Sequence, residues 1–272
     1  MVKKCILPVA GFGSRFLPVT KTIPKEMLPI LNKPLIQYAV EEVLDSDIND
    51  IAFITSKLKT SIEEYFKKND ELECLINGTE KEILLSSLNK IIKNCNLNFI
   101  NQDQMLGLGH AIMQGKDFVG ENSFAVLLPD DLCYNKDKSV LKQLLEISKK
   151  YPDMSIVAIE EVDSSSVNQY GIIDGELLGN SSNIYLVNDM IEKPDIKHSP
   201  SNMAIIGRYI LQPQVFEILR NTRPDLRGEI QITDALKKLS KESKVLAVKF
   251  EGIRLDCGSV KGYIEANNYF NN

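Results

Sequence analysis

The sequence contains no long hydrophobic run, since no stretch approaches the roughly 18 apolar residues from which a membrane-spanning helix is built. Its start also lacks the features of a signal peptide. Met1–Lys4 is too short for the charged leader region, and Pro8 and Gly11 interrupt the apolar residues that follow. These absences argue against an integral membrane protein, and we expect a cytoplasmic protein without a membrane partner.

Cysteines in metal-binding or redox spacing are also absent. The five cysteines are odd in number, and none forms a C-x-x-C pair. This usage is typical of a reducing compartment, so we expect buried free thiols and no disulfide framework. A chain of 272 residues needs no such framework, because a chain of this size buries roughly 75% of its unfolded surface on folding.

An excess of positive charge is missing as well. The formal net charge is -5 at pH 7, whereas nucleic-acid-binding domains are typically basic, so we expect no nucleic-acid partner. Only two histidines occur, His110 and His198, and for both we expect either a structural role or a role in supporting residues that contact the ligand. Neither an internal repeat nor a low-complexity linker divides the chain, which predicts one domain over residues 1–272.

The most informative stretch lies near the N-terminus. An apolar run at residues 5–10 is typical of a buried strand, and a loop with Gly11, Gly13, Arg15 and Lys25 follows it. Four prolines keep this loop out of helical geometry. Glycine lets backbone N–H groups approach an anion closely, and cations neutralise the charge of that anion. The loop therefore predicts a phosphate-binding site.

Two better-known phosphate loops do not fit this stretch. Gly11–Phe16 lacks the third glycine of the dinucleotide fingerprint, and it also lacks the G-x-x-x-x-G-K-[ST] pattern of the P-loop. Taken alone, two glycines after a strand are equally consistent with a tight turn. A dinucleotide-dependent oxidoreductase is therefore the least favoured enzyme class.

Strand and helix patterns alternate through the first 162 residues, which predicts a mostly parallel sheet covered on both faces. Short β runs follow, with Asp174-Gly175 as a hairpin signal. The sequence thus predicts an α/β fold whose mixed, mostly parallel sheet is flanked by helices, with a small antiparallel elaboration in the second half. We expect strands at 5–10, 51–55, 98–101, 123–131, 155–162 and 205–211, and helices from Pro34, from a capping box at Ser61, and at 81–94, 139–149, 213–220, 231–240 and 259–269.

These segments resemble those of the sugar-nucleotide pyrophosphorylases, which are nucleotidyltransferases with a Rossmann-like fold. The family pattern joins G-x-G-x-R to a lysine about ten residues later, here Lys25. Within the family, TKTIPKEMLPI is similar to the bacterial branch that uses UTP and glucose 1-phosphate, whereas the thymidylyl branch typically has glutamine where Glu26 stands. The resemblance covers nearly the whole chain, continuing through Gln102 with LGLGHAI, LPDD, YGII, IEKP, SPSNMAIIGRYIL, GEIQITDAL and LDCGS.

The resemblance implies how the first half binds a triphosphate. The backbone at Ala10, Gly11 and Gly13 would approach the nucleotide closely. Arg15 would grip the β- and γ-phosphates that leave as pyrophosphate, since its planar fork suits phosphate oxygens. Lys25 would act as a mobile point charge at the α-phosphate in the transition state.

The resemblance also implies a base site and a metal site. Gln102, with Gly107 behind it, would bind uracil, because an amide supplies both a donor and an acceptor. Glu26 would also contact the base. Asp130 and Asp256 would be the ligands of Mg²⁺, which usually takes one or two carboxylates together with phosphate oxygens and water.

The sugar side falls in the second half. Gly171 and Glu192 resemble the family's contacts to the glucose hydroxyls, and Lys193 resembles its contact to the sugar phosphate. We therefore divide the chain into a nucleotide-binding part at about 1–135 and a sugar-phosphate-binding part at about 136–272. For Asp131 we expect a turn, and an arginine within a strand, such as Arg208, is more often a partnered structural charge.

Two alternatives remain open at this point. One is a pyrophosphorylase for another nucleotide, such as the dTDP-glucose type, on the same scaffold. The other is a non-catalytic sugar-nucleotide-binding subunit, although such a protein would be expected to lose Arg15, Lys25 or one of the metal aspartates. The resemblance further implies a homo-oligomer, either a dimer or a tetramer.

Overall fold

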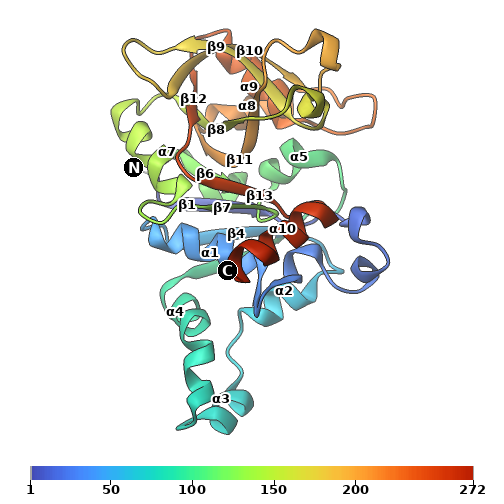
Figure 1. The fold of residues 1–272 in the computed structure, drawn as a ribbon, viewed down its shortest axis with the longest axis vertical. Coiled ribbons are helices and arrows are strands. Elements are labelled where there is room, and N and C mark those ends of the chain that lie inside the picture. The colour runs from blue at the N-terminus through green and yellow to red at the C-terminus, as the bar shows by residue number, and fades with distance from the viewer. Residues whose placement is uncertain (1, 272) are drawn as a thin grey trace.

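The centre of the molecule is one nine-stranded sheet, drawn in Figure 1. The computed structural model describes residues 2–271. The strands follow the order β5-β4-β1-β6-β11-β8-β12-β10-β9. Their bounds are β1 Lys4–Pro8, β4 Asp50–Thr55, β5 Asn96–Asn101, β6 Phe124–Leu127, β8 Ser155–Glu161, β9 Gly171–Leu177, β10 Ile184–Glu192, β11 Met203–Leu211 and β12 Val245–Lys249.

Most strands of this sheet run in one direction. β5, β4, β1 and β6 pair in parallel, and so do β8 and β12. β11 lies antiparallel between β6 and β8, and β10 is antiparallel to β12 and β9. The predicted α/β fold, with a mixed sheet and an antiparallel elaboration in the second half, is confirmed.

Helices cover both faces of the sheet, so alternate residues of one strand enter two different cores. In β1, Cys5 and Leu7 belong to the core on one face, and Ile6 belongs to the core on the other. This double burial explains why the strand reads as a continuous apolar run. The first core is covered by α1 Leu35–Asp45, α2 Thr60–Tyr65, α4 Ser86–Asn94 and α7 Val140–Lys150, and the second by α5 Gly107–Gln114, α6 Lys116–Val119, α8 Gln214–Arg220 and α9 Ile232–Ser240.

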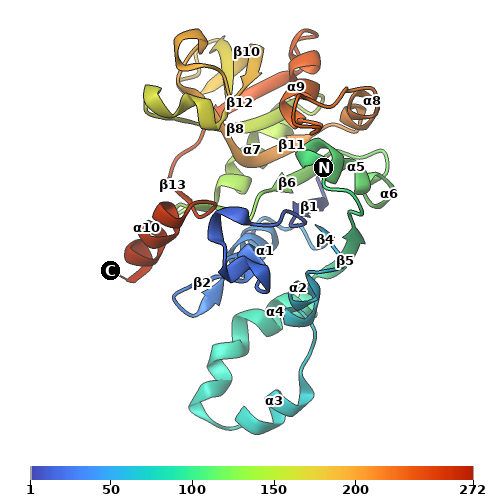
Figure 2. The same ribbon diagram turned by 90° about the vertical axis from the view of Figure 1, so that its right-hand side faces the viewer.

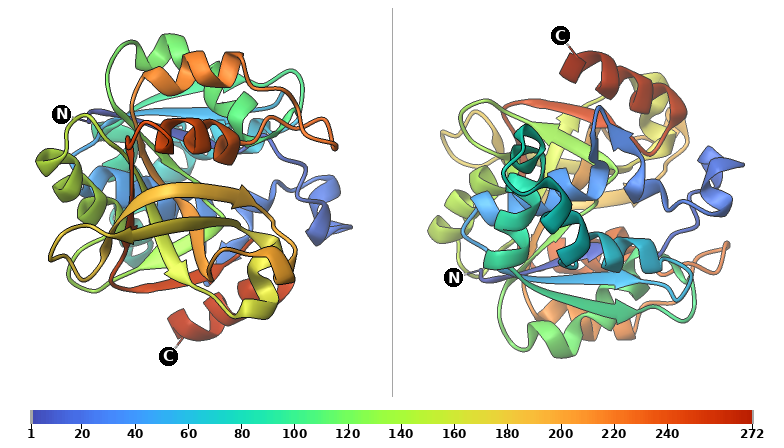
Figure 3. Two further views of the ribbon diagram at one scale, coloured as in Figure 1. Left: turned by 90° about the horizontal axis from the view of Figure 1, so that it is seen from above. Right: turned by 90° about the horizontal axis from the view of Figure 1, so that it is seen from below.

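A separate two-stranded antiparallel ribbon joins distant parts of the chain. It consists of β7 (Asp131–Tyr134) and β13 (Ile253–Asp256), and its register sets Asp256 opposite Asp131. The terminal helix α10 (Val260–Asn271) follows and lies at the rim of the molecule in Figure 3. The ribbon was not among the sequence predictions, although it carries Asp256 to the end of β6.

The segment around α3 (Asp70–Ile76) forms an arm that projects from the body, as Figure 2 shows. Neither α3 nor the following 3-10 segment, Glu80–Leu85, contains a buried residue. The helix predicted at 81–94 is divided, because the residues up to Leu85 belong to the 3-10 segment and only α4 (Ser86–Asn94) is α-helical.

Further short elements precede α1. They are 3-10 turns at Ser14–Phe16, Val19–Lys21 and Lys25–Met27, and a small ribbon of β2 (Pro29–Ile30) and β3 (Lys33–Pro34).

Three further local predictions were wrong. Asp174-Gly175 lies inside β9, at a bulge, rather than in a turn. Gly175 packs closely against β10, so that a Cβ there would meet the Leu186 carbonyl oxygen at 2.6 Å, and the glycine serves this contact and not a turn. Ser61 lies inside α2, whose N-cap is Lys59 and makes no side-chain capping bond. The cysteines are all free as predicted, but only Cys5 and Cys257 are buried, whereas Cys95 and Cys133 are half-buried and Cys74 is exposed on the arm. None of the helices within residues 2–271 is long and apolar enough to cross a membrane.

Candidate active site

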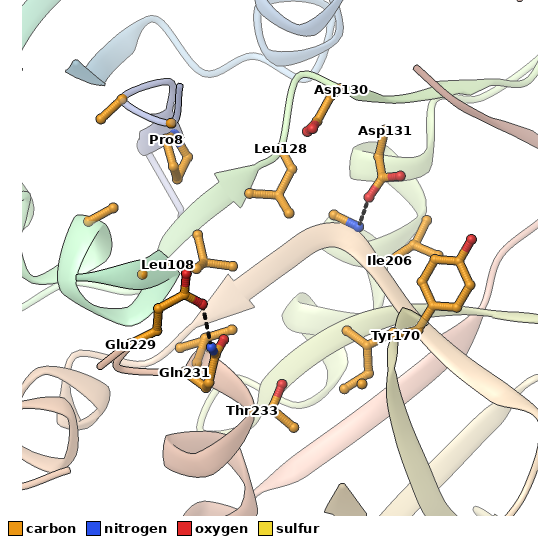
Figure 4. Close-up of a pocket in the computed structure, with 18 of the residues that line it drawn as sticks. Pro8, Leu108, Leu128, Asp130, Asp131, Tyr170, Ile206, Glu229, Gln231 and Thr233 are labelled. Atoms are coloured by element: carbon orange, nitrogen blue, oxygen red, sulfur yellow. Dashed lines mark hydrogen bonds between the residues drawn. The ribbon is translucent and has the colours of Figure 1, made fainter. Parts of the chain in front are cut away.

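A cavity of about 610 Å³ opens where β1, β5 and β6 end at their carboxyl ends, the edge at which open α/β sheets usually bind ligands. Figure 4 shows that its lining comes from both halves of the chain, with Asp130 from the loop after β6 and Thr233 from α9. All thirteen residues singled out from the sequence line this cavity: Ala10, Gly11, Gly13, Arg15, Lys25, Glu26, Gln102, Gly107, Asp130, Gly171, Glu192, Lys193 and Asp256.

The glycine loop folds back over the Lys25 side chain. Gly13 has a φ of 67°, which disfavours other residues, and a Cβ at this position would lie 3.1 Å from the Lys25 Cβ. The Thr20 hydroxyl donates to the Gly13 carbonyl at 2.8 Å. Arg15 reaches across to the Gly258 carbonyl at 3.3 Å. The loop thus brings both cations to the mouth of the cavity.

Lys25 and the two predicted metal aspartates meet at one place. The Lys25 ammonium lies 2.5 Å from Asp130 Oδ2. A Cβ on Gly258 would lie 3.0 Å from that same oxygen and 3.1 Å from Asp256 Oδ1, so the two carboxylates flank a space that only glycine leaves open. This arrangement fits Mg²⁺, which needs only one or two protein carboxylates when phosphates supply further oxygens. Residues 2–271 contain no cluster of three or more His, Cys, Asp or Glu side chains suited to a metal.

The two aspartates differ in charge environment. Burial alone would raise the pKa of Asp130, but the Lys25 ammonium beside it lowers that pKa below the usual value. Burial and the neighbouring Asp131 carboxylate raise the pKa of Asp256. Burial opposes the charge of Lys25, yet Asp130 and Glu26 raise its pKa above the usual value. Lys25 is therefore protonated at neutral pH and neutralises part of this acidic cluster.

Arg254 supplies a further positive charge here, and it was not predicted from the sequence. Its Nε donates to Asp131 Oδ1 at 2.6 Å and its Nη1 to Glu160 Oε1 at 2.7 Å, while Nη2 lies 3.8 Å from Asp256 Oδ2. Asp131 also accepts the Gly207 N–H at 2.9 Å, a bond drawn in Figure 4. Asp131 therefore connects β7 to β11 and does not simply form a turn.

Glu26 is buried and paired. It is 1% exposed, and the Lys59 ammonium donates to its Oε2 at 2.7 Å and to the Val9 carbonyl at 2.6 Å. The other oxygen, Oε1, has no hydrogen-bond partner among the described residues. Burial raises the pKa of Glu26 and lowers the pKa of Lys59. The charge of each residue acts on its partner in the opposite direction and reduces that shift. Lys59, which the sequence analysis did not single out, thus ties the end of β1 to Glu26.

Gln102 lies in the cavity wall with His110 behind it. Gln102 is 4% exposed, and its amide nitrogen lies 2.8 Å from His110 Nδ1. His110 itself does not line the cavity. Gly107 has a φ of 89°, and a Cβ there would meet the Glu229 Cβ at 2.9 Å. The start of α5 therefore packs tightly against the loop at 225–231.

The predicted sugar residues form a second group across the cavity. Thr233 Oγ1 donates to Glu192 Oε2 at 2.6 Å, and a Cβ at Gly171 would lie 3.0 Å from the Thr233 oxygen and 3.2 Å from the Glu192 oxygen. Lys193 has a φ of 47°, an uncommon conformation for lysine, and its ammonium lies 3.4 Å from Glu192 Oε1. Thr233, Glu229 and Gln231 were missed individually, although the segment GEIQITDAL had drawn attention to them.

Arg208 and His198 lie outside the cavity lining. Arg208 is 1% exposed and donates from Nε and Nη2 to Glu42 Oε2 at 3.1 and 2.8 Å, so it is the partnered structural charge that was expected. His198 is exposed, and its Nδ1 lies 3.9 Å from Asp195 Oδ2.

Comparison with known proteins identifies the family. The model of the nucleotidyl transferase family matches residues 4–272. A UTP–glucose-1-phosphate uridylyltransferase of Pseudomonas aeruginosa is 50% identical over 99% of this chain and 96% of its own length. The crystal structure of an apo UDP-glucose pyrophosphorylase superposes with a TM-score of 0.96 at 52% identity, covering 100% of this chain and 98% of the other. A second such structure, complexed with UDP-glucose, has a TM-score of 0.91 at 49% identity over 100% and 99%. This chain therefore belongs to the nucleotidyl transferase family, in the group of the UTP–glucose-1-phosphate uridylyltransferases.

Proposed function

We propose that this protein transfers UMP from UTP to glucose 1-phosphate, giving UDP-glucose and pyrophosphate. The observation that carries the proposal is the pairing of two groups in one cavity, a cationic glycine loop and the Gly171–Glu192–Lys193 group, in a chain 50% identical to an enzyme named for this reaction. The solved relative complexed with UDP-glucose agrees with it. Retention of Arg15, Lys25 and both aspartates argues against a non-catalytic binding subunit.

The reaction needs no general base from the protein. A sugar phosphate has a second pKa near 6, so at pH 7 it is largely dianionic and already a nucleophile. One of its oxygens attacks the α-phosphorus of UTP and forms a P–O bond, while the bond to the β-phosphate oxygen breaks in line and pyrophosphate departs with that electron pair. The main obstacle is repulsion between two anions, so catalysis consists of positioning and charge neutralisation.

Each charged side chain has a role in this scheme. Lys25 stabilises charge at the α-phosphate, Arg15 binds the leaving pyrophosphate, and Lys193 holds the sugar phosphate beside Glu192. The position of Lys25 supports its assignment, because its half-buried ammonium already lies at the aspartate cluster. Arg15 is exposed at the cavity mouth, which suits a group that must release a product.

Nucleotidyl transferases of this family generally use a divalent metal, and we propose Mg²⁺ with Asp130 and Asp256 as its ligands. When bound, the ion would neutralise and orient phosphate oxygens. The open space beside Gly258 supports this assignment. For the base we propose Gln102, Gly107 and Glu26, which all line the cavity.

Three wider proposals accompany this function. We propose one domain over residues 1–272, with the nucleotide bound mainly by 1–135 and the sugar phosphate mainly by 136–272. The continuous sheet supports the single domain, since β11 from the second half lies between β6 and β8. We also propose a homo-oligomer, either dimer or tetramer, and a cytoplasmic location.

The decisive experiment is a pyrophosphate-release assay that crosses UTP, dTTP, ATP and CTP with glucose 1-phosphate. We expect turnover with UTP to exceed turnover with each of the others. Preference for dTTP would favour the rival pyrophosphorylase on the same scaffold. Absence of turnover with all four nucleotides, together with binding of UDP-glucose, would instead favour the non-catalytic subunit.

A further inference from the structure

We infer that His110 is a positioning residue that fixes the amide orientation of Gln102 and thereby makes the site select uracil over cytosine. The inference rests on the proposed function, in which Gln102 binds the base. It adds a residue that does not line the cavity. The observations that carry it are the burial of Gln102 and the two amides that flank the imidazole.

The Gln102 side chain has one hydrogen-bond partner among residues 2–271. Its Nε2 lies 2.8 Å from His110 Nδ1, and the side chain is almost wholly removed from solvent. Its backbone N–H donates to the Thr55 carbonyl at 2.7 Å, which fixes the residue at the end of β5. The amide oxygen and the second N–H have no partner in the part of the chain that the structure describes, and they remain for a ligand in the cavity.

His110 is itself held in position. It lies on α5, whose first turn is bonded to the 225–231 loop: the Gly109 N–H donates to the Ile230 carbonyl and the Ile230 N–H to the Leu106 carbonyl, both at 2.8 Å. On the far side of the ring, the Gln114 amide lies 3.2 Å from His110 Nε2. The imidazole is therefore placed between two amides.

A neutral imidazole accepts at one nitrogen and donates at the other, so the two amides cannot both donate to it. We assign Nδ1 as the acceptor, because the contact to Gln102 is the shorter of the two. The Nε2–H then faces the Gln114 amide. The structure places the nitrogen of that amide 3.2 Å from Nε2, where it also donates to the His110 carbonyl at 3.3 Å, so this assignment requires the Gln114 amide to turn over and present its oxygen. Burial lowers the pKa of His110 and outweighs the opposing effect of a hydrogen bond with the Gln104 backbone, which favours the neutral ring that this assignment requires.

This arrangement determines which hydrogen-bonding group of the Gln102 amide faces the base. With one Gln102 N–H engaged by His110, the amide oxygen faces the base and accepts the N3–H of uracil. Cytosine has no hydrogen at N3 and would set its own lone pair against that oxygen. Without the acceptor at His110, the Gln102 amide could turn over and present an N–H to N3 of cytosine. The site would then no longer distinguish uracil from cytosine.

The experiment compares His110→Leu with His110→Asn. Asparagine can keep an acceptor oxygen close to the position of Nδ1, whereas leucine offers none. For each protein we would measure kcat and KM for UTP and CTP, and binding of UMP and CMP by calorimetry. We expect the UTP-to-CTP ratio of kcat/KM to fall about tenfold in His110→Leu, the worth of one hydrogen bond, mainly through KM, and to be largely restored in His110→Asn.

A second measurement does not depend on how the variants fold. The chain has only two histidines, so ¹⁵N NMR of the imidazoles of the unaltered protein gives two spin systems, with exposed His198 as the reference. We expect His110 to be neutral with its proton on Nε2. A proton on Nδ1, or an unchanged nucleotide ratio in a folded His110→Leu protein, would overturn the inference. Absence of UTP turnover in the unaltered protein would instead refute the proposed function.

Discussion

Lys25 lies between two possible partners, the Asp130 carboxylate that it contacts at 2.5 Å and the phosphate that would enter the cavity. A lysine suits this position because its ammonium is a compact charge on a flexible stem. The Asp130 oxygen that holds Lys25 is also the one that faces the space beside Gly258. At the residue scale, then, one carboxylate is shared by a side chain and the proposed metal.

We predict that Lys25→Ala lowers kcat by on the order of 100- to 1,000-fold, the loss typical of removing one group that stabilises the transition state. Binding of UDP-glucose should change little, because the ammonium acts mainly on charge that develops during the reaction. Steady-state kinetics and calorimetry measure the two quantities. Lys21→Ala, an exposed lysine in the same loop, is the control. A rate close to that of the unaltered protein would contradict the assigned role.

Asp130→Asn and Asp256→Asn should each raise the Mg²⁺ concentration needed for half-maximal activity by at least about tenfold. An amide supplies one neutral oxygen where the carboxylate supplied a charged one, so the ion is bound less tightly. Titration of activity against Mg²⁺, and Mn²⁺ binding followed by electron paramagnetic resonance, measure this effect. Asp137→Asn, exposed in the loop before α7, should titrate like the unaltered protein. Unchanged titrations in both variants would remove the metal-site assignment.

Lys59→Met should lower the free energy of unfolding by about 3–5 kcal/mol, because it leaves the buried Glu26 carboxylate without its counter-ion. Urea denaturation measures the change. Lys67→Met, just after α2, is the matched control. Lys67 pairs with Glu63 and Glu64 at the surface, so this substitution should leave the midpoint nearly unchanged. Equal effects of the two substitutions would show that the buried Glu26–Lys59 pair contributes no more to the free energy of unfolding than a surface ion pair does.

At the scale of elements, the 225–231 loop organises one wall of the cavity. The Asp225 carboxylate accepts the N–H groups of Arg227 at 2.8 Å and Glu229 at 3.0 Å, and the Gln231 amide at 3.1 Å. The bond from Glu229 is the main reason that the pKa of Asp225 lies well below its usual value. The same loop is bonded to the start of α5, so it fixes the position of His110 as well.

This loop predicts a pH dependence. A carboxyl whose pKa is depressed by folding stabilises the fold above its unfolded pKa, about 3.9, and that contribution is lost as the pH falls toward the lower folded pKa. Asp225→Asn should therefore be less stable than the unaltered protein at pH 7, and the difference should narrow below about pH 4. Urea midpoints across this range measure it. A difference that stays constant with pH would show that the charge of Asp225 is not responsible.

At the scale of the molecule, the cavity joins the two halves of the sheet, so a ligand that reaches both should stabilise the whole fold. At about 100 times its dissociation constant, UDP-glucose should add about 2.7 kcal/mol. For a protein of this size that corresponds to a rise of roughly 5–10 °C in the thermal midpoint. Differential scanning fluorimetry measures the shift, with ADP-glucose at the same concentration as the control. Equal shifts with both ligands would contradict uridine selectivity.

Local pattern was sufficient to predict the parts of the fold that depend on neighbouring residues. The apolar run at 5–10, the helix after Pro34 and the alternation up to residue 162 all appear in the structure, because doubly buried strands and amphipathic helices leave clear periodic signals. The failures also have physical reasons. Asp174-Gly175 has the composition of a turn, yet close packing against β10 keeps it within a strand.

The sequence by itself determined the class of fold, the cationic glycine loop and, through resemblance to a family, thirteen of the residues that line the cavity. Only the tertiary structure decided which side chains support them. Arg254 reaches Asp131 and Glu160 through the β7–β13 ribbon, Lys59 reaches Glu26 from the start of α2, and His110 stands behind Gln102. These contacts, most of them between segments far apart in the chain, depend on strand register and helix packing, which no local pattern in the sequence encodes.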